Sequence, residues 1–362
     1  MPKSGGTITS WGGHMRAITS VKDLESVVGR RLLPPMMKSI SELDGHCRVF
    51  AELSPLGFLS FVDGDGRDRT VAVGGAPGFA AVISDTSVAL DLPDGLGTPP
   101  TGSGAALLLL VPGLRETLRV NGRLTARDGK ASLAVEEAFL HCAKCVIRSR
   151  LWTPDLDAAA TPLSVAAAAE GPLSDERLTG FLARSPFAVI GSRDASGAAD
   201  LSPKGDPPGF LRILDGGTIA IPDRPGNQRT DTFHNIVEHP GVTVLAIVPG
   251  EEHALELAGT AAITDDADLL APMEVKGKRP HAALLMTVTR AELVHQPSLA
   301  TAGPWDPARQ PADLDRLDLR GAWVDHVKQN KRTGLAAALL RKAANPAITD
   351  AGIRMDYRRN LY

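Results

Sequence analysis

The sequence predicts a mainly β, α+β fold built from two tandem β-rich copies, with a helical tail at the end of the chain. Three observations predict it. Short apolar runs bounded by Gly, Pro or Asp recur along the chain, a pattern typical of short strands joined by turns. Several of these runs return in the same order about 130 residues later, which indicates an internal repeat. Beyond Pro311 the apolar residues change to helical spacing.

Each match between the two copies is short, but the matching segments follow one another in the same order in both copies. The Ser-Pro pair that opens a strand-like run at Ser54 recurs at Ser185, an offset of 131 residues. The offset becomes 137 where LLLVPG at 108–113 returns as LAIVPG at 245–250. The second copy has therefore gained six residues between these two blocks. Ordered matches with a single insertion indicate that the chain contains a duplicated unit.

Each copy supplies matching strand candidates. They are FLSFV, SVAL, ALLLLV and TLRVNGRLTA in the first copy and FAVIGS, TIAI, VTVLAIV and ALELAGTAAI in the second. Gly259 inside the last run indicates a bulge or a tight bend. We expect a helix after Ser174, a candidate N-cap, and another at 230–238 that stops before Pro240. In the tail, helical apolar spacing begins at Leu319.

These patterns divide the chain into four predicted segments. Residues 1–155 hold the first β-rich domain, and an Ala-rich linker follows at 156–173. Residues 174–310 hold the second domain. The helical tail occupies 311–362, and we expect it to pack one face on a barrel and leave the other in solvent.

Composition excludes several classes of protein. The chain has 39 Lys and Arg against 42 Asp and Glu, a formal net charge of −3, which argues against a dedicated nucleic-acid binder. Aromatic residues are only 4%, too few for platforms that stack single-stranded bases. The longest apolar run, 105–111, is too short to span a membrane, and the N-terminus lacks the apolar region of a signal peptide. We therefore expect a cytoplasmic protein that binds neither nucleic acid nor membrane.

Three cysteines are too few for a disulfide framework and fit a reducing compartment. Cys142 and Cys145 form a CxxC motif, but no second such motif exists to complete a zinc site. They are interpreted as two buried apolar residues on a helix, with a redox pair as the alternative. Cys47, next to His46, has no partner in sequence and is interpreted in the same way. The motifs therefore predict no metal site.

The second copy holds the densest unusual segments, DLSPKGDPPGF and IPDRPGNQRTDTFHN. In the first, Lys204 stands at the end of a predicted strand. The second is a Gly/Pro turn that opens onto the helix expected near Thr230, and it carries the candidate anion ligands Arg224, Asn227 and Arg229. Guanidinium groups, backbone amides and a helix N-terminus together favour a phosphate. PDRPGN is also good turn sequence, so a pair of surface turns stays an open alternative.

SPKGDPPGF, PDRPGN and VPG in the second copy, together with FLHCAKCVIRSRLW in the first, resemble the pyridoxamine 5′-phosphate oxidase-like family of flavin-binding split barrels. The resemblance covers most of residues 40–155 and 175–307. Members of that family bind FMN at a homodimer interface, where one subunit supplies a strand lysine and a phosphate loop and the other an RSxLW segment. The resemblance therefore implies two tandem split β-barrels packed as a pseudo-dimer.

The family's motifs are divided between the two copies. The first copy has AVGG at 72–75 where the lysine motif belongs, and in the second copy the segment 296–304 has lost the Arg-Ser pair. The resemblance implies one composite FMN site between the halves and a second position that has been lost. The implied cofactor residues are Ser202, Pro203, Lys204, Gly205, Arg224, Asn227 and Arg229 from the second copy, with Arg148, Ser149 and Trp152 from the first.

The resemblance implies an FMN-dependent oxidoreductase that acts on an unknown small molecule, the flavin exchanging hydride while the protein positions it. Lys204 is expected at the isoalloxazine ring, the loop from Arg224 to Arg229 at the phosphate, and Trp152 at the ring edge. The alternatives are a flavin or ligand binder without turnover, such as a carrier or sensor, and a related barrel that uses deazaflavin or haem. A pseudo-dimer complete as one chain and a further homodimer both stay open.

No residue is assigned as catalytic. His141, His234 and His295 are candidates for an acid or base only by residue type, and a lone histidine is more often structural.

Overall fold

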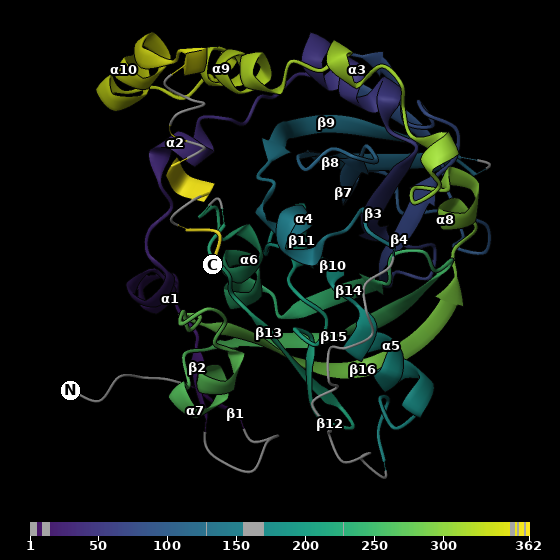
Figure 1. Ribbon diagram of the computed structural model, residues 1–362, viewed down its shortest axis with the longest axis vertical. Helices are drawn as coiled ribbons and strands as arrows, with labels where there is room; N and C mark the ends of the chain where they lie inside the picture. The colour runs from purple at the N-terminus through teal and green to yellow at the C-terminus, as the bar shows by residue number, and fades with distance from the viewer. Residues whose placement is uncertain are drawn as a thin grey trace.

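The computed structural model describes residues 6–8, 15–127, 129–154, 170–226, 228–347, 352, 355–357 and 360–362. In these residues the strands form two antiparallel sheets, one in the upper right and one in the lower part of Figure 1. Helices lie at the edges and in the space between the sheets. The mainly β, α+β class predicted from sequence is confirmed.

The first sheet has the strand order β4-β3-β7-β8-β9-β6-β5. Its strands are β3 (Leu56–Val62), β4 (Asp68–Gly74), β5 (Ala81–Ser84), β6 (Ser87–Asp91), β7 (Ser103–Leu110), β8 (Thr117–Arg127) and β9 (Lys130–His141). Strands β3 and β7 are almost wholly buried, because the sheet is covered on both faces.

The second sheet repeats this order as β11-β10-β14-β15-β16-β13-β12. Its strands are β10 (Phe187–Arg193), β11 (Ala199–Gly205), β12 (Arg212–Asp215), β13 (Thr218–Pro222), β14 (Gly241–Ile247), β15 (His253–Thr264) and β16 (Ala283–His295). Two N-terminal strands, β1 (Gly6–Ile8) and β2 (Met15–Ile18), extend it through β15. Since each strand has its counterpart seven strands later, the two copies share one topology, as the offsets of 131 and 137 predict.

Ten α-helices are seen in the described residues. They are α1 (Val21–Val28), α2 (Leu33–Met36), α3 (Gly45–Leu53), α4 (Lys144–Ser149), α5 (Glu176–Arg184), α6 (Asp231–Glu238), α7 (Ala267–Leu270), α8 (Pro297–Ala302), α9 (Leu319–Gln329) and α10 (Leu335–Ala343). Short 3₁₀ turns occur at Ala271–Met273, Pro307–Arg309 and Leu314–Arg316. The expected N-cap of α5, Ser174, is wrong by one residue, because it is the Asp175 carboxylate that accepts from Arg177 N at 2.8 Å.

The bulge expected at Gly259 is confirmed. The pairing of β15 with β16 shifts register between Ala258 and Gly259, and that of β8 with β9 shifts at Gly122, its counterpart 137 residues earlier. A Cβ at Gly259 would lie 2.0 Å from Thr287 O, so only glycine fits. The two copies therefore bend their longest hairpins by the same device.

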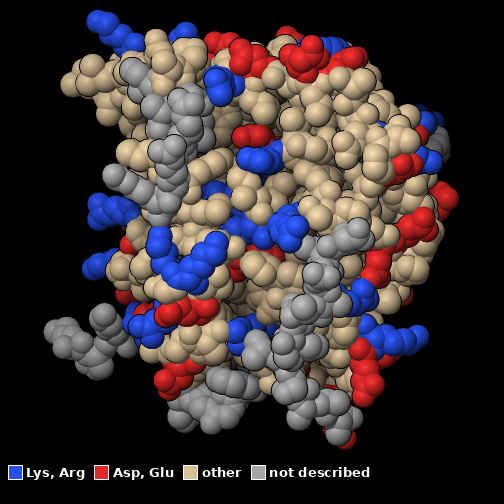
Figure 2. Space-filling view, in the orientation of Figure 1, with Lys and Arg blue, Asp and Glu red and all other residues tan. Residues whose placement is uncertain are grey.

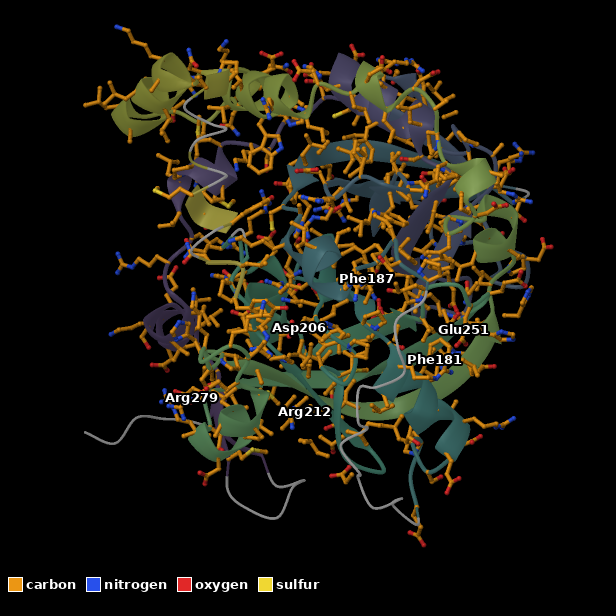
Figure 3. All side chains as sticks on the ribbon, viewed as in Figure 1. Phe181, Phe187, Asp206, Arg212, Glu251 and Arg279 are labelled. Carbon is orange, nitrogen blue, oxygen red and sulfur yellow. The ribbon has the colours of Figure 1, made fainter. Side chains whose placement is uncertain are left out.

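A separate hydrophobic cluster joins the two sheets. It combines Leu56, Phe58, Ala72 and Leu108 of the first copy with Phe187, Val189, Leu201 and Leu245 of the second. The Phe58 and Phe187 ring centroids are 6.3 Å apart, and Figure 3 shows Phe187 in the middle of the molecule. Ser60 and Gly191, which correspond by the offset of 131, also meet there, because a Cβ at Gly191 would lie 2.3 Å from Ser60 Oγ. Corresponding residues meet at the axis of a two-fold assembly, so the two sheets pack as a pseudo-dimer.

The two ends of the chain cross between the copies. Ile18 and Leu24, at the N-terminal end, belong to the core of the second copy, whereas Ala322 and Trp323 of α9 belong to the core of the first. The tail contains the helices α9 and α10, as the helical spacing predicts, but Leu335 of α10 is 79% exposed. Most of the predicted linker, residues 156–169, lies outside the described residues, and the four domain limits stay a prediction.

No described helix is both long and apolar enough to cross a membrane.

The bulge gives a test of the fold. Gly259→Ala should destabilise the chain by about 1–3 kcal/mol, because the added methyl group collides with a backbone carbonyl that is held in the sheet. Gly180→Ala in α5 is the matched control. Its Cβ meets nothing within 4 Å, so it should stabilise by about 0.5–1 kcal/mol. Urea unfolding gives the change in the free energy of unfolding for each variant. Equal changes for the two variants would contradict the bulge.

Candidate cofactor site

A cavity of about 1010 Å³ lies between the two copies. Its walls come from β8, β9 and α4 of the first copy, from β11, the 222–230 loop and α6 of the second, and from α2 and the tail. In Figure 1 these elements surround the centre left of the molecule, where α4, β11 and α6 face the C-terminal segment. The cavity is thus assembled from parts of the chain that are far apart in sequence.

The structure brings most of the predicted cofactor residues to this cavity. Those that line it are Arg148, Ser202, Pro203, Lys204, Gly205, Arg224 and Arg229. Ser149 is buried behind α4, where its hydroxyl donates to Val146 O at 3.2 Å. Trp152 is not brought to the cavity, because its ring packs in the cluster between the sheets and its Nε1 donates to Leu114 O. Asn227 lies outside the described residues.

Lys204 extends from β11 towards α6. Its Nζ lies 3.7 Å from Asp223 Oδ1 and 5.4 Å from the centroid of the Phe233 ring. The corresponding residue of the first copy, Val73, is buried in that copy's own core. Helix α6 has no counterpart in the first copy, so the six inserted residues and the lysine occur together where the cavity forms.

Helix α4 of the first copy packs against β11 of the second. The contact is close at Gly205, where a Cβ would lie 2.2 Å from Cys145 O. Arg148 Nε donates to Gly205 O at 2.9 Å, and its Nη1 donates to Pro225 O at 3.0 Å. Arg148 therefore ties the end of β11 to the 222–230 loop, and its side chain positions that loop from the other copy.

The two arginines of the loop are held by carboxylates. Arg224 Nε lies 2.6 Å from Asp206 Oδ2. Arg229 bonds Asp231, Ser39 and Glu137 through Nε, Nη1 and Nη2, at 2.8, 2.6 and 2.7 Å. The side chains of both arginines are therefore held in place before any ligand binds. The guanidinium nitrogens of Arg229 all donate to protein acceptors.

A buried arginine that the motif analysis missed lies behind the site. Arg119 of β8 reaches across the interface to Asp200 Oδ1 at 2.8 Å and Asp231 Oδ2 at 2.7 Å, and it donates to Ser202 Oγ at 3.1 Å. Its guanidinium also stacks 4.3 Å from the centroid of the Phe139 ring. Burial alone would raise the pKa of Asp231, but the guanidinium groups of Arg229 and Arg119 outweigh burial and hold this pKa below its usual value.

The pseudo-symmetric position carries the same ion pair with the charges exchanged. Glu256 of β15 corresponds to Arg119 by the offset of 137, and Arg69 of β4 corresponds to Asp200 by the offset of 131. Arg69 Nη2 lies 2.9 Å from Glu256 Oε2. A charged residue between apolar neighbours, in TLRVNG and in ALELAG, was the signal in the sequence that could have singled out Arg119 and Glu256, but it does not indicate their partners.

Cationic side chains outnumber acidic ones in the described lining of the cavity. The cations are Lys38, Arg119, Lys144, Arg148, Lys204, Arg224, Arg229, Lys278 and Arg279, and the acids are Asp206, Asp223, Asp231 and Asp356. Figure 2 shows blue side chains gathered on this face around the middle of the molecule, and Figure 3 places Asp206 near the middle and Arg279 at the lower left. Such an excess favours an anionic ligand.

Of the three candidate histidines, His141 lines the cavity. Burial, with the charge of Arg119, lowers its pKa to about 3, so the ring is neutral near pH 7. His234 Nδ1 bonds Thr230 O at 2.9 Å, and His295 Nε2 lies 3.4 Å from Glu252. Neither belongs to the described lining, whereas His281, which sequence reasoning did not single out, does.

The C-terminal segment closes one side of the cavity. Asp356 Oδ2 lies 2.7 Å from Lys144 Nζ, and Tyr357 Oη accepts from Ala143 N at 3.0 Å. Leu361 O accepts from Arg148 Nη1 at 2.8 Å. The segment therefore contacts both ends of α4. Cys142 and Cys145 beside these contacts are buried free thiols, as expected for structural residues.

The pseudo-symmetric second position is built differently from the first. Helix α8 takes the place of α4 and brings Leu299 and Ala302 into the cluster between the sheets. Gln296 is buried there, where its Oε1 accepts from Ala72 N at 3.3 Å and its Nε2 donates to Glu256 at 3.1 Å. The altered segment thus serves packing.

A scan against protein families gives one match. Residues 174–295 match the family model described as pyridoxamine 5′-phosphate oxidase. The second copy is therefore similar to this family over the matched residues. The matched segment contains β10 to β16 and α6, and hence Lys204 and the 222–230 loop. The family resemblance expected from sequence is confirmed for the second copy.

Solved structures resemble one copy at low identity. HupZ from Group A Streptococcus is 18% identical and covers 30% of this chain and 86% of its own, with a TM-score of 0.27. General Stress Protein 26 from Bacillus anthracis is 14% identical over 33% of this chain and 96% of its own, with a TM-score of 0.27. HutZ, the heme storage protein from Vibrio cholerae, is 13% identical over 33% and 93%, with a TM-score of 0.25. No curated protein matches the chain.

Removing the Arg119 guanidinium tests the interface. Arg119→Met should destabilise the chain by about 3–5 kcal/mol, because Asp200 and Asp231 keep their burial and lose a partner. Arg123→Met on the same strand is the control. Arg123 makes an exposed pair with Glu136, so its loss should change stability by less than about 1 kcal/mol. Similar unfolding midpoints for the two variants would contradict the buried ion pair.

The lowered pKa of the buried His141 predicts that the stability of the fold depends on pH. Its pKa is about 3 when folded and near 6.5 when unfolded, so below pH 6.5 the unfolded chain binds the extra proton. Stability should therefore fall from pH 6.5 towards pH 3, by up to about 1.4 kcal/mol per pH unit from this group. His141→Gln should remove that part of the slope, whereas His295→Gln at an exposed position should keep it. Parallel pH profiles for wild type and His141→Gln would contradict this account.

Proposed function

We propose that the chain binds one FMN in the cavity between its two copies and acts as an FMN-dependent oxidoreductase on a small molecule. The observation that carries the proposal is the convergence of Lys204 and the 222–230 loop of the matched segment with Arg148 of the other copy on a single cationic cavity. The volume of about 1010 Å³ is at the upper end of ligand pockets, which leaves room for a substrate beside the cofactor.

The residues present fit a phosphate-bearing flavin. Thr230, at the N-terminus of α6, makes no capping hydrogen bond through its side chain, and the first residues of the helix line the cavity. Asp206 Oδ1 is buried without a hydrogen-bond partner, an acceptor that a ligand hydroxyl or ring N–H would satisfy. We assign the phosphate to Arg224 and the start of α6, and the ring system to Lys204. When bound, the flavin supplies hydride transfer.

The chain's own groups would position ligands and exclude water. Lys204 would hold a hydrogen-bond acceptor of the ring, and Arg148 would keep the phosphate loop in place through its two backbone contacts. His141 is neutral near pH 7, so it can form a hydrogen bond with a ligand but holds no extra proton to donate as an acid. Trp323 and Tyr357 of the tail would wall the substrate side of the cavity. We propose a cytoplasmic site of action, which fits three buried free thiols.

A second candidate is a flavin carrier or sensor without turnover. The pairing of Arg224 and Arg229 with carboxylates favours it, because both guanidinium groups are engaged before any phosphate arrives. Turnover of reduced nicotinamide with an electron acceptor separates the two: enzyme-like rates support the oxidoreductase, and tight flavin binding without turnover supports the carrier. If the purified protein has the absorbance spectrum of a deazaflavin or of haem in place of a flavin spectrum, the cavity binds that cofactor and not FMN.

Flavin titration tests the assigned residues. Lys204→Ala and Arg224→Ala should each weaken FMN binding about 10- to 100-fold, as expected for the loss of a charged hydrogen bond. Arg177→Ala is the control, because Arg177 is an exposed cation on α5 that pairs only locally with Asp175. Quenching of flavin fluorescence gives the dissociation constants. If all three variants bind FMN like wild type, the phosphate and ring assignments are wrong.

A further inference from the structure

The tail meets the first copy at a cluster of three metal-binding side chains. Asp44 is the N-cap of α3, and its Oδ1 accepts from Cys47 N at 3.0 Å. Cys47 lies one turn into that helix, and His326 comes from α9, 279 residues further along the chain. Cys47 and His326 are buried and Asp44 is half-buried. The fold thus brings the cysteine that lacks a partner in sequence to a histidine of the tail.

The donor atoms are spaced as zinc ligands are. His326 Nε2 lies 3.3 Å from Asp44 Oδ2 and 3.8 Å from Cys47 Sγ, and all three donor atoms lie within 4.8 Å of one another. Zinc bonds to nitrogen, oxygen and sulfur are about 2.0–2.3 Å long, so neighbouring nitrogen, oxygen and sulfur ligands of a tetrahedral ion are about 3.3–3.6 Å apart. Shifts of a few tenths of an ångström would complete the geometry. Asp44 caps its helix through Oδ1, so Oδ2, which accepts from Gln329 Nε2 at 3.2 Å, is the oxygen that would face the metal.

The chemistry of the donors also selects zinc. A thiolate, an imidazole and a carboxylate form a mixed set that suits zinc, whereas calcium and magnesium prefer oxygen alone. A thiolate and a carboxylate carry two negative charges, which cancel those of the ion in a buried place. No fourth His, Cys, Asp or Glu belongs to the cluster among the described residues, so a bound ion would take a water molecule as its fourth ligand.

We propose that Asp44, Cys47 and His326 bind one zinc ion that fastens the tail helix α9 to α3 of the first copy. This site is distinct from the cofactor cavity, and the proposal does not depend on the proposed function. The alternative is a metal-free cluster in which His326 pairs with Asp44 and Gln329 Nε2 donates to the same carboxylate at 3.2 Å. The two arrangements differ in their response to zinc.

The test uses the full chain, stripped of metal with a chelator and then dialysed against zinc chloride. We expect one zinc per chain by elemental analysis and a higher midpoint of thermal unfolding with zinc than without it. Cys47→Ser and His326→Gln should weaken zinc binding at least about 100-fold, since even groups that only support a ligand contribute 10- to 100-fold. His326→Gln keeps a hydrogen-bond donor, which protects the fold in a metal-free cluster.

His46→Ala is the matched control. This histidine precedes Cys47 and pairs with Asp325 at 3.1 Å, outside the cluster, so its loss should leave zinc binding unchanged. Cobalt in place of zinc should give a thiolate-to-metal charge-transfer band that Cys47→Ser lacks. Substoichiometric zinc in the wild type, or equal zinc binding by wild type, Cys47→Ser and His326→Gln, would overturn the proposal in favour of the metal-free cluster.

Discussion

The ion pair between Arg119 and Asp200 is the constraint on which the arrangement of the two copies depends. A guanidinium with 1% of its side chain exposed needs acceptors fixed in position, and these come from β11 and α6 of the other copy. The pair therefore sets how β8 lies against β11. That placement brings α4 onto Gly205 and Arg148 onto the 222–230 loop. The cavity is a consequence of this packing.

The duplication explains why the two pseudo-symmetric positions differ. Both copies share one strand order, one bulge and one bridging ion pair, with the charges of that pair exchanged. In a homodimer every change would appear twice, whereas a fused pair can alter each half alone. The first copy buries Val73 where the second presents Lys204, and α8 with the buried Gln296 stands where the other position has α4 with Arg148.

Local features were predictable because their causes are local. Strand patterning, the bulge at Gly259 and the stop of α6 before Pro240 follow from neighbouring residues. The offsets also predicted the shared topology. Contacts between distant segments were not predictable in this way: nothing near Arg119, Cys47 or Leu361 in sequence indicates its partner. Trp152 matched a motif, yet its ring serves the cluster between the sheets, because a motif fixes residue type and not direction.

Flavin content of the purified chain tests most directly whether the two copies share one cofactor. The chain would be saturated with FMN and freed of excess, and the flavin would be released by heat and counted by absorbance against protein. One flavin per chain is the value that a single composite cavity predicts. Two flavins per chain would mean that the position at α8 also binds, and no uptake of added FMN would mean that the cavity serves a different ligand.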